Sequence, residues 1–467
     1  MKNTTVAAVS TPYGRGGIAV IRISGEDAIA IAEKVFKPFS GTPLSECRSN
    51  YAVYGNILSL KSSSDTDAER IDDGIATVFR APRSYTGEDT VEISCHGGIL
   101  LTEKVLSSVF LAGATPAGPG EFTQRAFLNG KLDLSEAEAV IGLIDAESEA
   151  KLKLSASHTS GVLKRRMDSI YNDVKTLLSS VYVSLDYPEE DLEEVSDAEF
   201  LASLKRIHAD LCSTADTYRE GKAVSEGVKT ALIGKPNTGK SSLLNALLGE
   251  KRAIVTAVPG TTRDIIEEKV NIGKILLRLS DTAGIRESAD EVEKIGIEMA
   301  REKARDSELI IALFDLSRPA EAEDNVLISE IEALRSDGKT VLIALNKSDG
   351  DALFDESILP EGVQTVRISA KNGDGLDALK KTVEALFVSG DIDYSSTAVI
   401  ANARQFSAIS GAKDAVKRAI EALESGVMAD TCGLDLEKAL EEIGQVDGRS
   451  VAGDITDAIF HNFCVGK

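Results

Sequence analysis

The residues best suited to chemistry form a glycine-rich stretch in mid-chain, Gly234-Lys-Pro-Asn-Thr-Gly-Lys-Ser241. Gly234 and Gly239 allow the backbone to curl so that successive amide groups point at an anion. Lys240 can reach the outer phosphates of a nucleotide, and Ser241 can ligate Mg²⁺ at the start of the helix that follows. Taken alone, a match of this length could also be a chance glycine-rich turn, so the rest of the chain must decide.

Three further motifs follow, and each comes directly after an apolar run that is typical of a strand: Asp281-Thr-Ala-Gly284, Asn346-Lys-Ser-Asp349 and Ser369-Ala-Lys371. Ligands of open α/β sheets bind at the carboxyl ends of the strands, so we expect these residues to meet there. Asp281 can hold Mg²⁺ through water, and the Gly284 amide can sense the γ-phosphate. Asp349 can accept from the ring N–H and exocyclic amine that distinguish guanine from adenine, while Asn346 and Lys347 brace the base. Together the motifs predict a guanine-nucleotide site.

The loop between the first two motifs, Thr256-Ala-Val-Pro-Gly-Thr-Thr-Arg-Asp264, has the position of a switch that closes over Mg²⁺ and the γ-phosphate. Thr262 is its candidate switch residue. Small signalling GTPases place a water-orienting glutamine directly after the second motif, but here that position is Ile285. The residues alone do not rank the acids that could replace it, which are Glu287, Asp290, Glu291 and Glu293.

The motifs need a sheet to position them, and residues 228–388 alternate apolar strands with helical or loop segments. This pattern predicts a doubly wound, mostly parallel sheet. The predicted strands are 229–234, 275–281, 309–315, 340–346 and 364–369, and residues 221–227 are interpreted as a short linker before them. Residues 1–130 are strand-rich, with predicted strands at 18–23, 51–58, 74–79 and 90–95 and helices at 26–36 and 100–111.

Helical periodicity dominates on both sides of this sheet. Ser135 with Glu138 and Ser196 with Glu199 have the spacing of capping boxes. One apolar face repeats at steps of four and three residues between Leu163 and Val181, and others follow residue 395. Isolated helices cannot bury such faces, so we expect residues 131–224 and 389–467 to form one helical domain together.

Composition narrows the class of protein. A length of 467 residues predicts two to four domains, and a net charge of −23 argues against a surface coated with basic groups for nucleic acid. Five scattered cysteines with no C-x-x-C argue against disulfides or a zinc site and for a reducing compartment, so a cytoplasmic location is expected. No apolar run reaches about 18 residues, so no membrane is expected as a partner.

The motifs resemble those of a known family. GKPNTGKSSLLNALL, IVTAVPGTTRD, DTAGIRESADEVEKIGIE and the terminal FCVGK are similar to the tRNA-modification GTPase MnmE (TrmE) family, as are SYTGEDTVEISCHGG and PGEFTQRAFLNGKLDLSEAEAV near the start. The resemblance covers the whole chain. It implies a multidomain α/β protein in which a Ras-like P-loop G domain (225–388) is inserted into an α-helical domain (131–224 and 389–467), preceded by a strand-rich α+β folate-binding and dimerisation domain (1–130).

The resemblance also implies an activity and partners. The family's GTPases work as homodimers with a flavin-dependent partner, MnmG (GidA), to place an aminomethyl or carboxymethylaminomethyl group on carbon 5 of the wobble uridine of certain tRNAs. A tetrahydrofolate derivative, 5-formyl or methylene, supplies the one-carbon unit. The folate-binding residues would be Arg22, Glu92, Lys131 and Lys467. Without the resemblance, each of these charged residues would be interpreted as a solvated surface charge.

For hydrolysis, the resemblance implies that K⁺ replaces an arginine finger when two G domains meet across the nucleotide. Its ligands would be Asn237, Thr256, Val258 through its carbonyl, and Thr261, while Glu293 would orient the water. Mg²⁺ would be held by Ser241 and Thr262. Cys464 is a candidate for a catalytic role in modification, against the plainer interpretation of an inert cysteine near the C-terminus.

The motifs and the resemblance together give one predicted GTP-binding set: Asn237, Thr238, Gly239, Lys240, Ser241, Ser242, Thr256, Thr261, Thr262, Asp281, Thr282, Ala283, Gly284, Asn346, Lys347, Asp349, Ser369, Ala370 and Lys371. The alternative functions are a ribosome-assembly GTPase that acts as an RNA-binding switch and a scaffold that binds GTP without turnover. The first would need a basic RNA-binding appendage, whereas this chain has acidic helices and a strand-rich N-terminal region.

Overall fold

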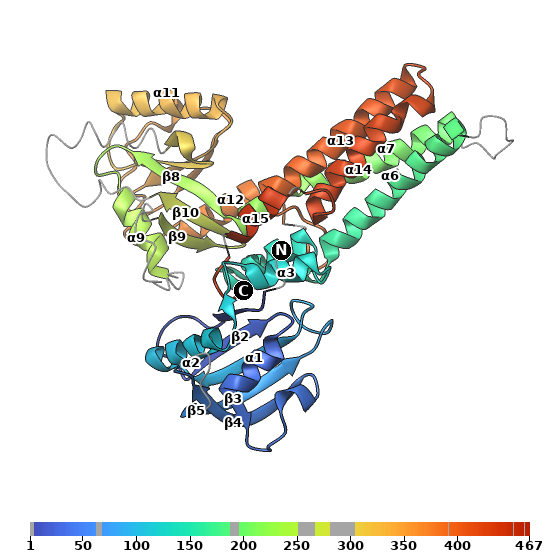
Figure 1. Ribbon diagram of the computed structural model, residues 1–467. Helices are drawn as coiled ribbons and strands as arrows, with labels where there is room; N and C mark the ends of the chain where they lie inside the picture. The colour runs from blue at the N-terminus through green and yellow to red at the C-terminus, as the bar shows by residue number, and fades with distance from the viewer. Residues whose placement is uncertain are drawn as a thin grey trace. The chain divides into compact units, whose positions relative to one another are not determined.

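The computed structural model describes residues 4–61, 68–186, 196–250, 267–280, 304–390, 392–451, 453–461 and 463–467. The chain forms two compact units, one of Met1–Ile141 with Gly444–Lys467 and one of Gly142–Ile443 (Figure 1). Within the described residues, no helix combines the length and the apolar character needed to cross a membrane.

The first unit is built on a seven-stranded sheet of order β3-β4-β5-β6-β2-β1-β7. Its neighbouring strands are antiparallel except β1 and β7, which are parallel. The strands are β1 (Val6–Val9), β2 (Ile18–Ser24), β3 (Phe36–Pro38), β4 (Tyr51–Ser59), β5 (Glu69–Phe79), β6 (Thr90–His96) and β7 (Thr115–Pro116). All four strands predicted from alternation are confirmed.

Helices α1 (Ala28–Val35) and α2 (Ile99–Leu111) pack on this sheet, because their apolar residues and those of alternate strand positions form one core. Ile21, Ile23 and Ile93 are among its fully buried side chains. The remaining elements wholly within the unit are η1 (Leu44–Glu46), α3 (Glu121–Leu128) and α15 (Gly453–His461).

Helix α4 (Leu134–Ile144) ends at the edge of the unit, and α14 (Gly433–Asp447) enters it. Phe460 and Phe463 near the C-terminus are buried with Leu134 and Ala137 of α4, so the last residues of the chain belong to the N-terminal unit. The capping box of α4 is not Ser135 with Glu138 as predicted. Asp133 Oδ1 accepts from the Glu136 amide and Glu136 Oε2 from the Asp133 amide, because the helix starts two residues earlier than the serine would allow.

The second unit contains a six-stranded sheet of order β13-β12-β11-β8-β10-β9, in which only β9 is antiparallel to its neighbour. The strands are β8 (Val228–Gly234), β9 (Glu267–Ile272), β10 (Ile275–Ser280), β11 (Leu309–Asp315), β12 (Thr340–Asn346) and β13 (Gln364–Arg367). Two apolar cores, one on each face, involve α9 (Lys240–Glu250), α11 (Ala322–Ser336) and α12 (Leu376–Phe387). This is the predicted doubly wound sheet; β9 was missed because its sequence, EEKVNI, is that of a polar edge strand.

The helical part of the second unit comprises α5 (Glu149–Thr159), α6 (Val162–Asp186), α7 (Asp197–Asp216), α8 (Tyr218–Ser225) and α13 (Ala403–Glu424), joined by the first part of α14. The short 3₁₀ turns of this unit are η2 (Glu356–Ile358) and η3 (Ala429–Cys432). In Figure 1, α6, α7 and α13 run side by side, and α7 packs against both of the others. The predicted apolar face of α6 is buried, and the Ser196–Glu199 capping box of α7 is confirmed.

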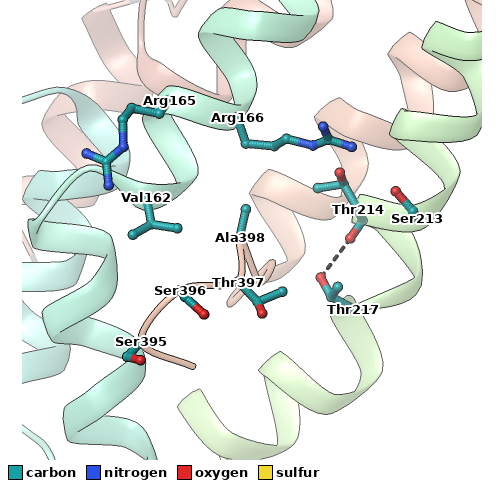
Figure 2. Close-up of a pocket in the computed structure, with 10 residues that line it drawn as sticks. All are labelled: Val162, Arg165, Arg166, Ser213, Thr214, Thr217, Ser395, Ser396, Thr397 and Ala398. Carbon is teal, nitrogen blue, oxygen red and sulfur yellow. Dashed lines mark hydrogen bonds between the residues drawn. The ribbon is translucent and has the colours of Figure 1, made fainter. Parts of the chain in front are cut away.

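The predicted linker at residues 221–227 is wrong for most of its length, because α8 continues to Ser225. Gly221 is needed there for close packing rather than flexibility, since a Cβ at this position would lie 2.1 Å from the Ile400 carbonyl oxygen. A pocket of about 650 Å³ lies between α6, α7 and the 395–398 segment (Figure 2). The predicted fold class is confirmed, while the three predicted domain boundaries stay predictions.

Candidate nucleotide and folate sites

The glycine-rich loop connects the carboxyl end of β8 to the first turn of α9. Its backbone takes the left-handed region at Asn237 (φ +60°) and at Gly239 (φ +99°). A Cβ on Gly239 would lie 2.1 Å from Asn346 Nδ2, so only glycine fits. The loop therefore curls tightly at the sheet edge, as the spacing of its glycines predicts.

Lys240 extends along this loop, and its Nζ donates to the carbonyl oxygens of Gly234 at 2.6 Å and Lys235 at 2.8 Å. Burial lowers the pKa of the Lys240 ammonium, which has no carboxylate among these contacts. Thr238 is buried, and its hydroxyl donates to the Lys235 carbonyl at 2.8 Å. A partly desolvated cation beside a curled loop fits a phosphate group, which would supply the missing negative charge.

Asn346, at the end of β12, joins the glycine-rich loop to the loop that carries the last motif. Its Nδ2 donates to the Thr238 carbonyl at 2.7 Å, and its Oδ1 accepts from the Ala370 amide at 2.9 Å. The residue is buried, so both bonds form where water does not compete. Residues that are more than 100 positions apart in sequence are thereby fixed as one site.

Asp349 lies exposed beside this junction, and its Oδ1 accepts from the Ser369 hydroxyl at 2.8 Å. That hydrogen bond lowers the pKa of the Asp349 carboxyl. Lys371 is exposed nearby in sequence, and Ser241 and Ser242 lie in the first turn of α9. An ionised, exposed carboxylate held in position fits the donor edge of guanine.

Sequence reasoning missed Asp315, at the end of β11 between β8 and β12. Its Oδ2 lies 2.6 Å from Lys347 Nζ, and Lys347 itself has φ +64°. Burial acts to raise the pKa of Asp315, but hydrogen bonds from Lys347 and Ser317 outweigh it and lower the pKa to about 2. The sequence signal that could have identified Asp315 is a carboxylate at the end of a strand, at the same sheet edge as the motifs.

A number of predicted residues lie outside the described residues: Thr256, Val258, Thr261, Thr262, Asp281, Thr282, Ala283, Gly284 and Glu293. Of the predicted K⁺ ligands, the structure therefore describes Asn237 alone.

Arg22 and Glu92 of the predicted folate set face each other across β2 and β6. Arg22 Nε and Nη2 both lie 2.8 Å from Glu92 Oε1. The guanidinium carbon is 5.3 Å from the Tyr85 ring centroid and 5.5 Å from that of Phe122. Arg22 Nη1 is buried with no hydrogen-bond partner among the described residues, and such a donor fits an oxyanion or a carbonyl of a ligand.

The C-terminal tail, residues 464–467, brings Lys467 to the same place. Val465 forms an antiparallel bridge with Pro119, and the Phe122 amide donates to the Lys467 carbonyl at 3.2 Å. Phe122 thus contacts both Arg22 and the end of the chain. Cys464 is exposed, and its carbonyl accepts from the Gly120 amide at 3.3 Å.

Lys131 is anchored elsewhere in the unit. Its Nζ donates to the Pro82 carbonyl at 3.1 Å, and its neighbour Asn129 donates to the Thr86 carbonyl at 2.7 Å. Phe122 links Arg22, and through it Glu92, to the backbone of Lys467, while Lys131 contacts the segment that carries Tyr85.

Comparison with known proteins bears on both sites. The family model described as the MnmE helical domain matches residues 134–464, and the one described as GTP-binding protein TrmE N-terminus matches residues 5–131. The tRNA modification GTPase MnmE of Clostridioides difficile is 40% identical over 467 residues and covers 99% of both chains. That of Carboxydothermus hydrogenoformans is 40% identical over 471 residues and covers 100% of both. This chain belongs to the MnmE family of tRNA modification GTPases.

Membership of the MnmE family confirms the resemblance that the motifs indicated. The roles of individual residues stay predictions, because the matches cover whole domains rather than particular side chains.

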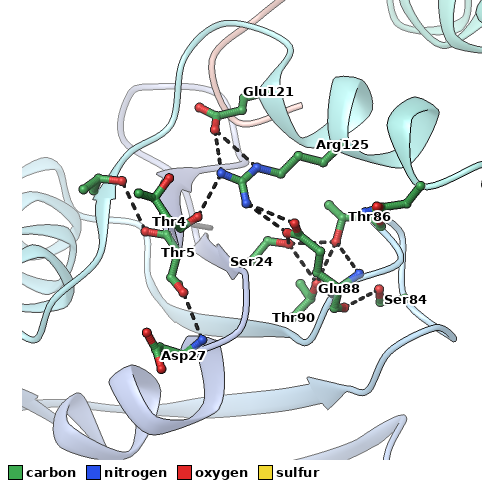
Figure 3. Close-up of polar contacts among 12 residues, drawn as sticks. Thr4, Thr5, Ser24, Asp27, Ser84, Thr86, Glu88, Thr90, Glu121 and Arg125 are labelled. Atoms are coloured by element: carbon green, nitrogen blue, oxygen red, sulfur yellow. Dashed lines mark hydrogen bonds and ion pairs between the residues drawn. The ribbon is translucent and has the colours of Figure 1, made fainter. Parts of the chain in front are cut away.

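A polar network that sequence reasoning missed fixes the segment beside Arg22 and Glu92, which are predicted to bind folate (Figure 3). Arg125 of α3 is buried and forms ion pairs with Glu88 at 3.1 Å and Glu121 at 2.8 Å. Glu88 accepts from the Ser24 hydroxyl at 2.8 Å, and Ser24 lies 2.7 Å from Thr86 Oγ1. This network ties the 84–90 segment to β2 and α3, so it positions Tyr85 above Arg22.

Proposed function

We propose that this chain hydrolyses GTP and that its nucleotide cycle drives modification of carbon 5 of the wobble uridine in certain tRNAs. The added group is an aminomethyl or carboxymethylaminomethyl group. Membership of a family of tRNA modification GTPases supports the activity and the tRNA substrate class. The observation that carries the nucleotide part is Asn346, which links the glycine-rich loop to the loop beside Asp349.

The described residues can bind GTP with little rearrangement. Lys240 would exchange the carbonyls of Gly234 and Lys235 for phosphate oxygens, and this exchange restores full charge pairing to a partly buried ammonium. Asp349, favoured in its ionised form by Ser369, would accept from the guanine edge. Ser241, with Thr262, would hold Mg²⁺, which neutralises charge on the β- and γ-phosphate oxygens.

For hydrolysis we assign charge neutralisation to K⁺ rather than to an arginine finger, as the resemblance to the MnmE family implies. Ile285 stands where other GTPases have the glutamine that orients the water, so another residue must place the water. Asn237, exposed on the loop at φ +60°, is the described candidate ligand, with Thr256, Val258 and Thr261. Glu293 would orient the water. This site would be completed when the G domains of a homodimer meet.

GTP hydrolysis in KCl and in NaCl at equal ionic strength tests this assignment. Hydrolysis should be faster in KCl, and Asn237→Ala should remove the advantage while GTP binding persists. Asn325→Ala, at an exposed asparagine of α11 outside the predicted GTP-binding set, is a matched control and should keep it. Equal, slow rates of GTP hydrolysis by the wild-type chain in both salts would contradict the K⁺ proposal.

In the N-terminal unit we propose a site for a tetrahydrofolate derivative, 5-formyl or methylene, which would supply a one-carbon unit. Arg22 would meet a negatively charged or carbonyl group through its unpaired Nη1, with Glu92 fixing the guanidinium. Lys467 and Lys131 would add positive charge, and Cys464 is a candidate for the modification chemistry. Arg22→Gln should abolish 5-formyltetrahydrofolate binding, and undiminished binding would contradict the site.

The proposal includes a flavin-dependent partner of the MnmG (GidA) type, which the resemblance to the MnmE family implies. A cytoplasmic location goes with it, since this is where a tRNA substrate and a nucleotide pool meet. Co-purification of the chain with such a partner tests this part.

A further inference from the structure

The pocket in the helical part of the second unit belongs to neither site described above. It is lined by α6 through Val162, Arg165 and Arg166, by α7 through Ser213, Thr214 and Thr217, and by Ser395, Ser396, Thr397 and Ala398. At about 650 Å³ it falls in the size range of pockets that hold a nucleotide-sized group, about 300–1,000 Å³. Its lining contains two cations and no acid.

The two arginines keep donors available. Arg165 is exposed and donates through Nη1 to the Ser160 carbonyl at 2.8 Å, and this is its one hydrogen bond among the described residues. Arg166 donates through Nη2 to Asp210 at 2.7 Å, which neutralises part of its charge. Each guanidinium carries five N–H groups, so several face no protein acceptor.

Three hydroxyl groups of the α7 lining differ from the arginines, because they already donate their protons to backbone carbonyls. Those of Ser213 and Thr214 donate to the Asp210 carbonyl, and that of Thr217 donates to the Thr214 carbonyl, as the dashed line in Figure 2 marks. Their protons are committed, so the side-chain donors left for a ligand are those of the two guanidinium groups and the Thr397 hydroxyl. A ligand that only accepts hydrogen bonds and carries negative charge satisfies this lining.

Asp210 and Asp393 contact residues of the lining without lining the pocket themselves. Asp210 pairs with Arg166. Asp393 precedes the 395–398 segment and accepts from the hydroxyls of Ser395 and Ser396, which lower the pKa of its carboxyl to about 2. Its ionised carboxylate is therefore bonded within the turn that it caps, while the charged groups that line the pocket are the two arginines.

We propose that this pocket receives the phosphate backbone of RNA, and so gives the tRNA of the proposed function a docking point on an acidic chain. In Figure 2 the Arg165 and Arg166 side chains leave α6 in opposite directions, so each faces a different part of the pocket. Successive phosphates along a backbone could meet the two guanidinium groups separately. With a net charge of −23, the chain needs such local cationic points to hold a polyanion.

The experiment measures binding of the full chain to unmodified tRNA over a range of KCl concentrations. Arg165→Gln and Arg166→Gln should each weaken binding about tenfold at low salt and reduce the slope of log K against log[salt] by about one. Arg206→Gln is the matched control, because Arg206 lies on α7, pairs with Asp173 at 3.2 Å and does not line the pocket. It should leave the affinity and the slope unchanged.

A second variant keeps both arginines. Thr397 lines the pocket and its hydroxyl has no partner among the described residues, so Thr397→Glu adds a negative charge there. It should weaken tRNA binding as much as losing one arginine does. Unchanged GTP hydrolysis would show that each variant is folded.

The outcomes separate the proposals. A wild-type chain that binds no tRNA would overturn the proposed function itself. A wild-type chain that binds tRNA, with unchanged binding by all three pocket variants, would overturn the pocket assignment alone. The wild-type chain could instead bind inorganic phosphate, GMP or polyglutamate as tightly as tRNA. If Arg165→Gln loses that binding and still binds tRNA, the pocket has a different ligand. This result would also overturn the pocket assignment.

Discussion

At the scale of single residues, the nucleotide site depends on side chains that join loops as much as on those that would touch GTP. Asn346 holds two loops together by two hydrogen bonds in a buried position, and Asp315 holds Lys347. The motif residues could be predicted from sequence because each motif is contiguous. Asp315 and Arg125 could not, because their partners come from other elements and only the fold brings them together.

Asp349→Asn should exchange guanine for xanthine as the preferred base. The amide NH₂ would face the donor edge of guanine, while it can donate to the carbonyl that xanthine has in place of the amine. Because hydrogen bonds to a charged group are lost, GTP should bind about 10- to 100-fold more weakly. Competition between GTP and XTP measures this change. Asp355→Asn, an exposed carboxylate that caps η2, should change neither affinity, and equal GTP affinity in Asp349→Asn would exclude the assignment.

Asp315 should make stability depend on acid pH. Its folded pKa of about 2 lies below the ordinary 3.8, so ionisation stabilises the folded state above about pH 4. That contribution, about 2 kcal/mol, is lost as the pH falls from about 4 to about 2. Asp315→Asn should therefore unfold in urea with a free energy that changes less over this window. An identical pH dependence in both proteins would show that the Lys347 contact contributes nothing.

At the scale of elements, the C-terminal tail is the feature that most exceeds what its sequence indicates. The resemblance implied a role for Lys467, but the bridge of Val465 with Pro119 depends on contacts more than 300 residues apart. The linker predicted at 221–227 was wrong, and β9 was not predicted, in each case because of the place that the residues take in the fold. Gly221 serves packing against the Ile400 carbonyl, and β9 is polar because it is an edge strand.

Gly466→Ala should release the tail. Gly466 has φ +97°, and an added Cβ would lie 2.1 Å from the Val9 carbonyl oxygen. The amides of Gly120 and Phe122, which donate to Cys464 and Lys467, should then exchange hydrogen faster. Gly453→Ala, where an added Cβ has open space, should leave both amides protected. Unchanged protection in Gly466→Ala would mean that the tail is not held by these contacts.

At the scale of the whole molecule, sequence patterns predicted both sheets and the helical segments, because alternation and periodicity report directly on which faces are buried. They did not predict that residues 444–467 group with residues 1–141, since that grouping rests on Phe460 and Phe463 packing with α4. This grouping places the chain's last residues in the unit that carries Arg22. A GTPase of the MnmE family thus has its proposed nucleotide and folate residues in two separate compact units.

The most direct test of the account is the nucleoside composition of tRNA from cells in which this chain has been deleted and then restored. Deletion should remove the group on carbon 5 of the wobble uridine from the affected tRNAs, and the wild-type chain should restore it. Asp349→Asn should restore it poorly, because this variant binds GTP about 10- to 100-fold more weakly, while Asp355→Asn should restore it fully. Wobble uridines that remain fully modified in the deletion strain would contradict the central claim that GTP hydrolysis by this chain drives their modification.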